Sequence, residues 1–209
     1  MRRSTPFVLA GAAAAGLLAA GFPARTGLTR SEAAVSLPGD LLVPTATIVA
    51  DRAVRIGAGA DAVWPWLTQI GQDRGGFYSW TPVENALGCE IEDARDLRPE
   101  WSEREVGDEV SLAPGMTLRV AVSSPGRALV LTSEGGRVPE ESAGSASMRF
   151  AFTWAFVLID EGGACVLHVR ERYRPDNRSA DLMIRAVLAA SAVMTVRMLR
   201  TIRRLAEGR

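Results

Sequence analysis

The stretch RFAFTWAFVLID at residues 149–160, followed by ACVLHVRERYR at residues 164–174, decides the fold of this chain. In the first stretch large apolar residues alternate with smaller or polar ones, and this period of two is typical of a strand with one buried face. Only EGG at 161–163 separates the two stretches, a spacing typical of a β-hairpin. The sequence therefore predicts two long antiparallel strands, the first carrying an aromatic face: Phe150, Phe152, Trp154 and Phe156.

Other strands are predicted on the N-terminal side of this hairpin. TIVADRAVRI at 47–56 is rich in β-branched residues and roughly alternating. MTLRVAVSS at 116–124 and RALVLTSE at 127–134 surround a Pro-Gly turn, which predicts a second hairpin. In its first strand, we expect three side chains to share the buried face: Leu118, Val120 and Val122.

The rest of the regular structure is predicted to be helical. Short helices are expected near residues 61–70 and 81–87, each ended by glycine. From about Ser179 to Glu207, apolar residues recur at spacings of three and four, which predicts one long amphipathic helix. Its inward stripe is expected to include Met183, Val187, Ala190, Met194 and Met198.

This order of elements predicts an α+β fold. A curved antiparallel sheet must cover its apolar face, and the C-terminal helix is the only predicted element long enough to do so. Where the helix and the sheet diverge, their inward side chains would line a cavity. We therefore expect a sheet that grips a helix, with a binding site between them.

The N-terminus has a different character. Residues 1–24 begin with Arg2 and Arg3 and continue as an uncharged run of Ala, Gly and Leu, a pattern typical of a signal sequence or a transmembrane anchor. A cleaved signal and a buried Ala-rich helix are the alternatives. Residues 25–46 are predicted to be a linker and residues 47–207 the folded domain. We expect that domain to lie at the cell membrane on its extracytoplasmic side, or to be secreted if the segment is cleaved.

Composition excludes several classes of function. The chain has 24 basic and 24 acidic residues, so it lacks the broad positive field of a nucleic-acid-binding protein. One His and two distant cysteines, Cys89 and Cys165, cannot form a structural zinc site. Residues 89–115 are acidic and predicted to be irregular, and they lack the pattern of a calcium loop. We expect no metal and no cofactor, and the sequence leaves the oligomeric state open.

Several motifs indicate a family. AVWPWLTQIGQDRGGFYSW at 62–80 resembles the actinobacterial branch of the polyketide cyclase/dehydrase and lipid-transport superfamily (SRPBCC), the START-like or birch-allergen-like helix-grip proteins. Similar matches are LPGD at 37–40, VGDEVSL at 106–112, TWAFVL at 153–158 and VRERY at 169–173. The resemblance implies a helix-grip fold, and an uncleaved N-terminal anchor, which members of this branch often carry. It leaves the activity open, because the superfamily includes lipid carriers, hormone receptors, aromatases and cyclases.

The candidate ligand site is the cavity between the sheet and the helix. Its apolar walls are predicted to include Phe152, Trp154, Phe156 and Met194, and flexible thioethers suit a site for variable ligands. The alternative interpretation is a fully packed core. In either case no residue is assigned a catalytic role.

Polar candidates lie near the same cavity. Glu171 and Tyr173 share the inward face of their strand and are predicted to bind the polar end of a ligand, Glu171 needing a partner such as an arginine. Tyr78 and Glu84 are predicted at the cavity mouth, where Glu84 has the alternative role of satisfying backbone groups. His168 shares the opposite face with two arginines and is expected to be exposed to solvent.

The sequence thus favours a protein that binds, and in one version transports, a hydrophobic small molecule or lipid. The first alternative is an aromatase/cyclase-type enzyme that uses the same cavity, with Tyr173 or Glu171 moving protons. The second is a membrane-tethered interaction protein that docks through the acidic segment at residues 84–109 and the basic C-terminal helix.

Overall fold

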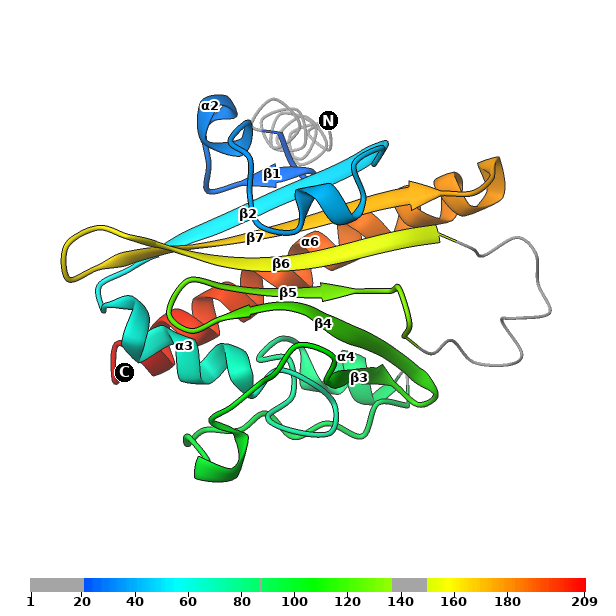
Figure 1. Cartoon of the computed structure of the whole chain (residues 1–209). Helices are drawn as coiled ribbons and strands as arrows, with labels where there is room; N and C mark the ends of the chain where they lie inside the picture. The colour runs from blue at the N-terminus through cyan, green and yellow to red at the C-terminus, as the bar shows by residue number, and fades with distance from the viewer. Residues whose placement is uncertain (1–20, 87, 137–149) are drawn as a thin grey trace, which may run out of the picture.

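The computed structural model describes residues 21–86, 88–136 and 150–209 and shows a curved sheet wrapped around one long helix (Figure 1). The strands are β1 (Arg25–Thr26), β2 (Ile48–Ile56), β3 (Glu109–Ala113), β4 (Met116–Ser124), β5 (Ala128–Thr132), β6 (Phe150–Asp160) and β7 (Cys165–Pro175). The helices are α2 (Arg30–Ala33), α3 (Ala60–Thr68), α4 (Thr81–Ala86) and α6 (Arg178–Ala206), with short 3-10 turns at Asp40–Leu42 and Pro99–Trp101.

The β6–β7 hairpin forms the middle of the sheet. The strand order is β1-β2-β7-β6-β5-β4-β3, and every neighbouring pair is antiparallel except β1 with β2. The hairpin pairs without interruption from Phe150 opposite Pro175 to Asp160 opposite Cys165. The alternating pattern of the two stretches therefore predicted both strands and their partnership correctly.

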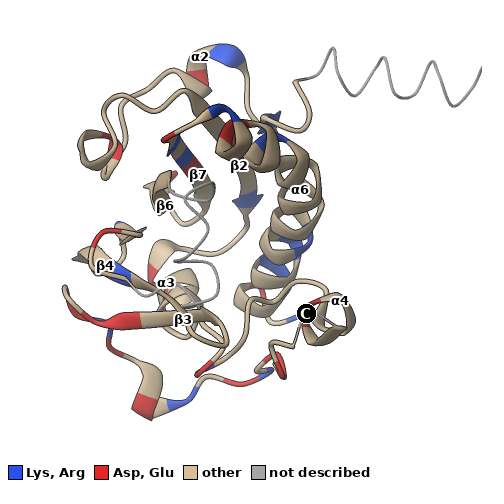
Figure 2. Cartoon of the chain, turned by 90° about the vertical axis from the view of Figure 1, so that its right-hand side faces the viewer, with Lys and Arg blue, Asp and Glu red and all other residues tan. Residues whose placement is uncertain are grey.

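Helix α6 lies across the concave face of the sheet, and Figure 2 shows α6 and α4 on the open side of its curve. The side chain of Asn177 caps the helix by accepting a hydrogen bond from the Ala180 amide at 2.9 Å. At the other end, the carboxylate of Glu207 accepts from the Gly57 amide at 2.8 Å, which ties the helix to the end of β2. This is the helix-grip α+β fold that the sequence predicts; the apolar helix predicted within residues 1–24 lies outside the described residues, which begin at Gly21.

The stripe of α6 that packs tightly against the sheet differs from the predicted one. Buried positions of the helix include Ile184, Leu188, Ala192, Leu199 and Ile202. Of the predicted stripe, Met198 is among the buried positions, whereas Val187 and Ala190 lie beside them and Val187 is 54% exposed. Both stripes have helical spacing, so the period alone does not distinguish the side that meets the sheet from the side that lines a space.

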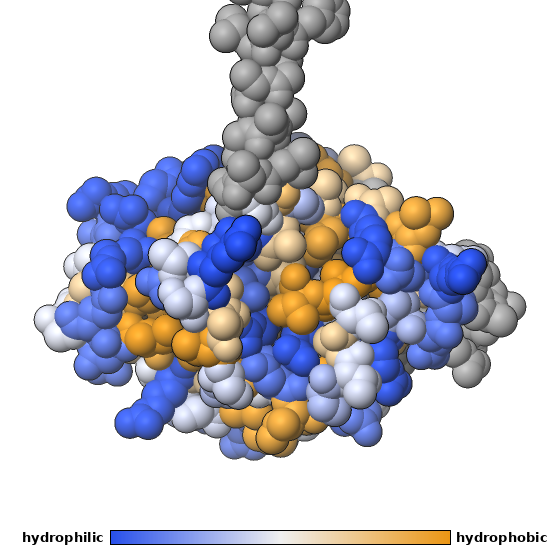
Figure 3. All heavy atoms as spheres, turned by 90° about the horizontal axis from the view of Figure 1, so that it is seen from above, coloured by the Kyte–Doolittle hydropathy of each residue, from blue (hydrophilic) through white to orange (hydrophobic). Residues whose placement is uncertain are grey.

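The convex face of the sheet is also covered. Residues 25–46, predicted as a linker, form β1, which pairs with the edge of β2, and α2, and Leu37 of this segment packs against residues of β5 and β6. Arg170 holds this segment by donating to the Asp51 and Asp40 carboxylates and to the carbonyls of Val35 and Ala33, at 2.7–2.9 Å. From above, the covered face is a mixture of hydrophilic and hydrophobic residues (Figure 3).

This cover corrects the prediction for His168. The imidazole is fully buried, and its Nε2 lies 2.7 Å from the Asp51 carboxylate. The strand pattern placed His168 correctly on the face that also carries Arg170 and Arg172. It could not indicate that a segment more than a hundred residues earlier in the chain would shield that face from water.

Two further predictions about strands were wrong. Residues 109–113, assigned to an irregular segment, form β3 and pair with β4. In β4, Leu118 and Val120 face the main core as expected, but Val122 packs with the residues of the convex side. The cause is an irregularity in the pairing with β5 between Val120 and Val122, which reverses the facing of the side chains beyond it.

Candidate functional site

A cavity of about 740 Å³ lies between the concave face of the sheet and α6. Its volume is within the range of roughly 300–1,000 Å³ that is usual for small-molecule sites. Most of its lining is apolar and comes from β6, β7, α6 and the segment around β3. The apolar lining includes Phe77, Leu112, Met116, Phe150, Phe152, Trp154, Met183, Ile184, Val187, Met194 and Met198.

The structure divides the predicted apolar candidates. Phe152, Trp154 and Met194 line the cavity. Phe156 does not: it is fully buried in the main core, with its ring 4.7 Å from that of Trp154. At that end of β6, the helix α3 contacts both the strand and α6 and closes the space between them. The aromatic face of β6 therefore lines the cavity at one end and belongs to the packed core at the other.

Tyr78 also lies outside the cavity lining. It is fully buried, its hydroxyl accepts a hydrogen bond from Gln69 Nε2 at 3.2 Å, and its ring contacts Trp66 edge-on. Burial raises the pKa of Tyr78 to about 12, so the phenol stays neutral. A Cβ on Gly75 would lie 2.8 Å from the Tyr78 hydroxyl, so glycine at this position makes room for the tyrosine. Tyr78 therefore holds the Gly-rich turn together and is not a cavity-mouth residue.

One polar end of the cavity is centred on Glu171. This carboxylate is 2% exposed and forms an ion pair with Arg52 of β2, with Arg52 Nη1 2.7 Å from Glu171 Oε1. The same oxygen accepts from the hydroxyls of Ser191 and Thr195 on α6, at 2.8 and 3.3 Å. Glu171 thus has the arginine partner that a buried carboxylate requires, as predicted. A fourth hydrogen bond to this carboxylate comes from a neighbouring tyrosine on β7.

That tyrosine is Tyr173. Its hydroxyl donates to Glu171 Oε2 at 3.1 Å, and its ring stacks on Phe152 with centroids 4.6 Å apart. Burial, together with the neighbouring negative charge of Glu171, raises the pKa of Tyr173 well above its ordinary value. Tyr173 is therefore a neutral hydrogen-bond donor whose proton is already committed to Glu171.

The opposite polar region is centred on Glu84 of α4. Its side chain lines the cavity and is only 3% exposed, yet neither carboxylate oxygen has a hydrogen-bond partner among the described residues. Burial, and after it the negative charge of Asp93, raises the pKa of Glu84 to about 7. The nearby Ser79 hydroxyl opposes this rise, although its geometry falls outside that of a normal hydrogen bond.

Several lining residues escaped the sequence analysis, and some had left a signal. Ser191 and Thr195 interrupt the apolar stripe of α6 four residues apart. Arg52, which pairs with Glu171 but does not itself line the cavity, occupies an inward position of an alternating strand. A polar residue at a position where the periodic pattern predicts an apolar one is itself a sign of a buried hydrogen-bond network. Ser79 and Cys89 left no such sign, because they follow glycine-rich turns without a period.

Two further polar side chains near the Gly-rich turn, Asn85 and Arg74, have structural roles. The Asn85 side chain donates a hydrogen bond to the Ile91 carbonyl and accepts one from the Ile91 amide. Arg74 donates to the carbonyls of Thr68 and Glu103. Both cysteines are buried and free. No group of three or more His, Cys, Asp or Glu residues in the described part of the chain is placed to hold a metal ion.

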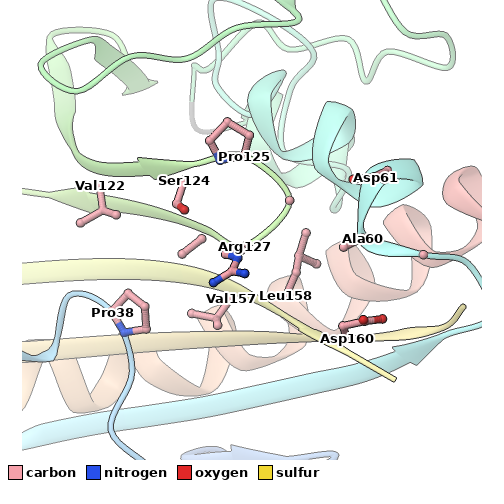
Figure 4. Close-up of a pocket in the computed structure, with 13 residues that line it drawn as sticks. Pro38, Ala60, Asp61, Val122, Ser124, Pro125, Arg127, Val157, Leu158 and Asp160 are labelled. Atoms are coloured by element: carbon pink, nitrogen blue, oxygen red, sulfur yellow. The ribbon is translucent and has the colours of Figure 1, made fainter. Parts of the chain in front are cut away.

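A second hollow of about 750 Å³ lies at the turn between β4 and β5, beside the start of α3 (Figure 4). Its charged side chains, Asp61, Arg127 and Asp160, are all exposed. A polar ligand there would exchange contacts with water for similar contacts with these groups, so this hollow is the weaker candidate.

Comparison with known proteins finds distant structural likeness only. Neither protein-family models nor curated proteins match the chain. Norcoclaurine synthase from Thalictrum flavum is 13% identical, covering 77% of this chain and 94% of that one, with a TM-score of 0.46. A protein from Chromobacterium violaceum is 13% identical, covering 76% and 96%, with a TM-score of 0.45. A Polyketide_cyc-like protein from Corynebacterium glutamicum is 12% identical, covering 76% and 91%, with a TM-score of 0.38. At such identities and scores, these likenesses say nothing about what this chain binds.

Proposed function

We propose that this protein binds a hydrophobic small molecule or a single lipid chain in the cavity between the sheet and α6. The observation that carries the proposal is the cavity itself, about 740 Å³ with a mainly apolar wall. A space of this size lined by aromatic rings and thioethers favours apolar ligands, because each buried methylene contributes roughly 0.8 kcal/mol. A more specific version of this proposal is that the protein also transports the bound molecule.

The two alternatives receive less support. For an enzyme, Glu171 or Tyr173 would have to move a proton, but Glu171 is held by Arg52 and Tyr173 already donates to Glu171. Both groups therefore fit a role in closing and positioning the cavity wall. For an interaction protein, the interior would be filled by its own side chains, whereas this interior retains a large space.

We also propose that residues 1–24 attach the domain to the outer side of the cell membrane, since two arginines precede their apolar run. Helix α6 is also long and apolar enough to span a membrane by length and composition. It contributes nothing to this proposal, because a helix that packs against a sheet meets the same criterion. Fractionation of cells that express the full chain tests the attachment: recovery in the soluble cytosol would contradict it.

Filling the cavity tests the binding function. Ala190 lines the cavity, whereas its neighbour Ala189 on the same helix does not, although both residues are partly open to solvent. We expect the full chain to bind N-phenyl-1-naphthylamine with an increase in its fluorescence. Ala190→Trp should weaken this binding at least about tenfold, the equivalent of losing one or two buried methylenes.

Ala189→Trp is the matched control, because it adds the same side chain to the same helix outside the cavity. We expect it to bind the probe as the unchanged chain does. Equal binding by both variants would show that the probe sits elsewhere, and no binding by the unchanged chain would overturn the proposal. Native mass spectrometry of the extracted protein then identifies any lipid that remains bound.

A further inference from the structure

Three polar side chains around the cavity lack partners for hydrogen-bonding atoms. They are Glu84, with both carboxylate oxygens, Ser79, with its hydroxyl, and Trp154, with its indole Nε1. All of these atoms are buried, and none makes a hydrogen bond of normal geometry to another described residue, although the Ser79 hydroxyl lies close enough to Glu84 to lower the pKa of its carboxyl. Leaving such a group unpaired costs about 1–3 kcal/mol, so each one requires an explanation.

The two polar regions of the cavity differ in this respect. At Glu171, the carboxylate receives hydrogen bonds from Arg52, Tyr173, Ser191 and Thr195. That region has little capacity left for a ligand. At Glu84, the described residues supply no hydrogen bond of normal geometry beyond the approach of the Ser79 hydroxyl, although α4 and the preceding turn are held firmly by Asp93, which accepts from the Tyr78 amide and the Thr81 hydroxyl. The remaining hydrogen-bonding capacity of the cavity is therefore at the Glu84 region.

The chemistry of these groups restricts what can bind there. An ionised carboxylate only accepts hydrogen bonds, an indole N–H only donates, and a hydroxyl does either. No Arg, Lys or His is among the described residues that line the cavity, and Arg52 is already paired with Glu171. Asp93 adds a second negative charge near Glu84. An anionic group would therefore meet repulsion with no compensating cation.

We propose that Glu84, Ser79 and Trp154 form a head-group subsite that takes a hydrogen-bond donor of the ligand, a hydroxyl or an amine, and excludes a carboxylate or phosphate. The donor bonds Glu84, while Trp154 Nε1 donates to an acceptor atom of the ligand. This inference rests on the proposed function, because it names the polar end of the same ligand. Neutral alcohols or amines with a large apolar body fit the cavity, and free fatty acids do not.

The protonation of Glu84 makes the selectivity depend on pH. With a pKa of about 7, Glu84 is largely neutral at pH 6 and largely ionised at pH 8. An amine ligand, charged at both pH values, should therefore bind more tightly at pH 8, and a carboxylate ligand less tightly. An alcohol stays neutral over this range and should change least.

Four naphthalene compounds of nearly equal size test the subsite: 2-methylnaphthalene, 2-naphthol, 2-naphthylmethylamine and 2-naphthoate. Binding to the full chain is measured by calorimetry at pH 6 and pH 8. We expect the naphthol and the amine to bind at least about tenfold more tightly than the naphthoate at pH 8. Tighter binding of the amine than of the naphthol at pH 8 points to a cationic head group, and the reverse to a hydroxyl; either order supports the subsite.

Glu84→Gln removes the charge and keeps the shape of the side chain. In this variant the preference over naphthoate should fall to within about threefold, and the pH dependence should disappear. Glu92→Gln is the matched control, since Glu92 is exposed and does not line the cavity, and it should leave both unchanged.

The outcomes separate this inference from the proposed function. If 2-methylnaphthalene binds and naphthoate binds as well as naphthol, the cavity function stands and the subsite is overturned. The same holds if Glu84→Gln leaves the preference intact. If none of the four compounds binds, both proposals are overturned.

Discussion

Replacing Glu84 by glutamine should stabilise this protein at alkaline pH and do progressively less as the pH falls. In the folded chain Glu84 is buried, and its pKa is raised from 4.5 to about 7, first by burial and then by Asp93. A carboxyl group whose pKa is raised by folding binds more protons in the folded than in the unfolded state between these two values. The free energy of unfolding therefore decreases as the pH rises from about 4.5 to about 7 and then levels off.

The size of this loss follows from the rise in pKa. At about 1.36 kcal/mol for each pH unit, a rise from 4.5 to about 7 corresponds to about 3 kcal/mol of lost stability above pH 7. Glu84 borders a cavity and not a packed core, so we reduce this value by half for solvent screening, to about 1.5 kcal/mol. A glutamine has no proton to lose here, and any cost of burying its amide is the same at every pH.

Urea unfolding of the full chain, followed by tryptophan fluorescence, measures the free energy of unfolding at each pH. The stability of Glu84→Gln relative to the unchanged chain should grow by about 1–2 kcal/mol between pH 5 and pH 8. The exposed control Glu92→Gln should show no such trend. A difference for Glu84→Gln that stays constant within about 0.5 kcal/mol over this range would refute a buried, unpaired carboxylate at this site.

Other substitutions test the remaining parts of the structure. Arg52→Met leaves Glu171 buried without its cation and should lower the free energy of unfolding by about 3–5 kcal/mol in urea, whereas adding Glu171→Met should recover most of the loss; a single variant as stable as the unchanged chain would contradict the ion pair. Arg170→Met removes the contacts that hold residues 25–46 on the sheet, so limited trypsin digestion should cut this segment faster, and an unchanged rate would argue against its docking. Phe156→Ala should cost about 3–5 kcal/mol because Phe156 is core, while Met194→Ala, beside an existing cavity, should cost less than about 1 kcal/mol; equal losses in thermal unfolding would mean that the two positions are packed alike.

The elements of the sheet were predictable because their signals are local. The alternation in residues 149–160 and 164–174, with a short turn between them, specifies both strands and their antiparallel pairing. The spacing of apolar residues in the last thirty residues likewise places α6 within one residue of its observed bounds. The irregular pairing that turns Val122 to the convex face has no such signal, because it depends on how two strands meet.

The candidate site was predictable only in part. Phe152, Trp154, Met194, Glu171, Tyr173 and Glu84 all line the cavity, while Phe156 and Tyr78 do not. The difference between Trp154 and Phe156 lies in what stands opposite them, since α3 closes the space over one and leaves it open over the other. A strand pattern reports which face is inward, but not how far away the opposing element is.

The sequence by itself thus determined the helix-grip architecture and an inner surface of aromatic and methionine side chains, since both follow from periods that each segment carries alone. Only the tertiary structure decided the polar chemistry of that interior. Arg52 meets Glu171 from 119 residues away, and His168 is buried by a segment near the N-terminus. Whether a charged side chain is paired or left open depends on distant parts of the chain coming together, and for this reason Glu84 emerges as the unpaired group only in the folded molecule.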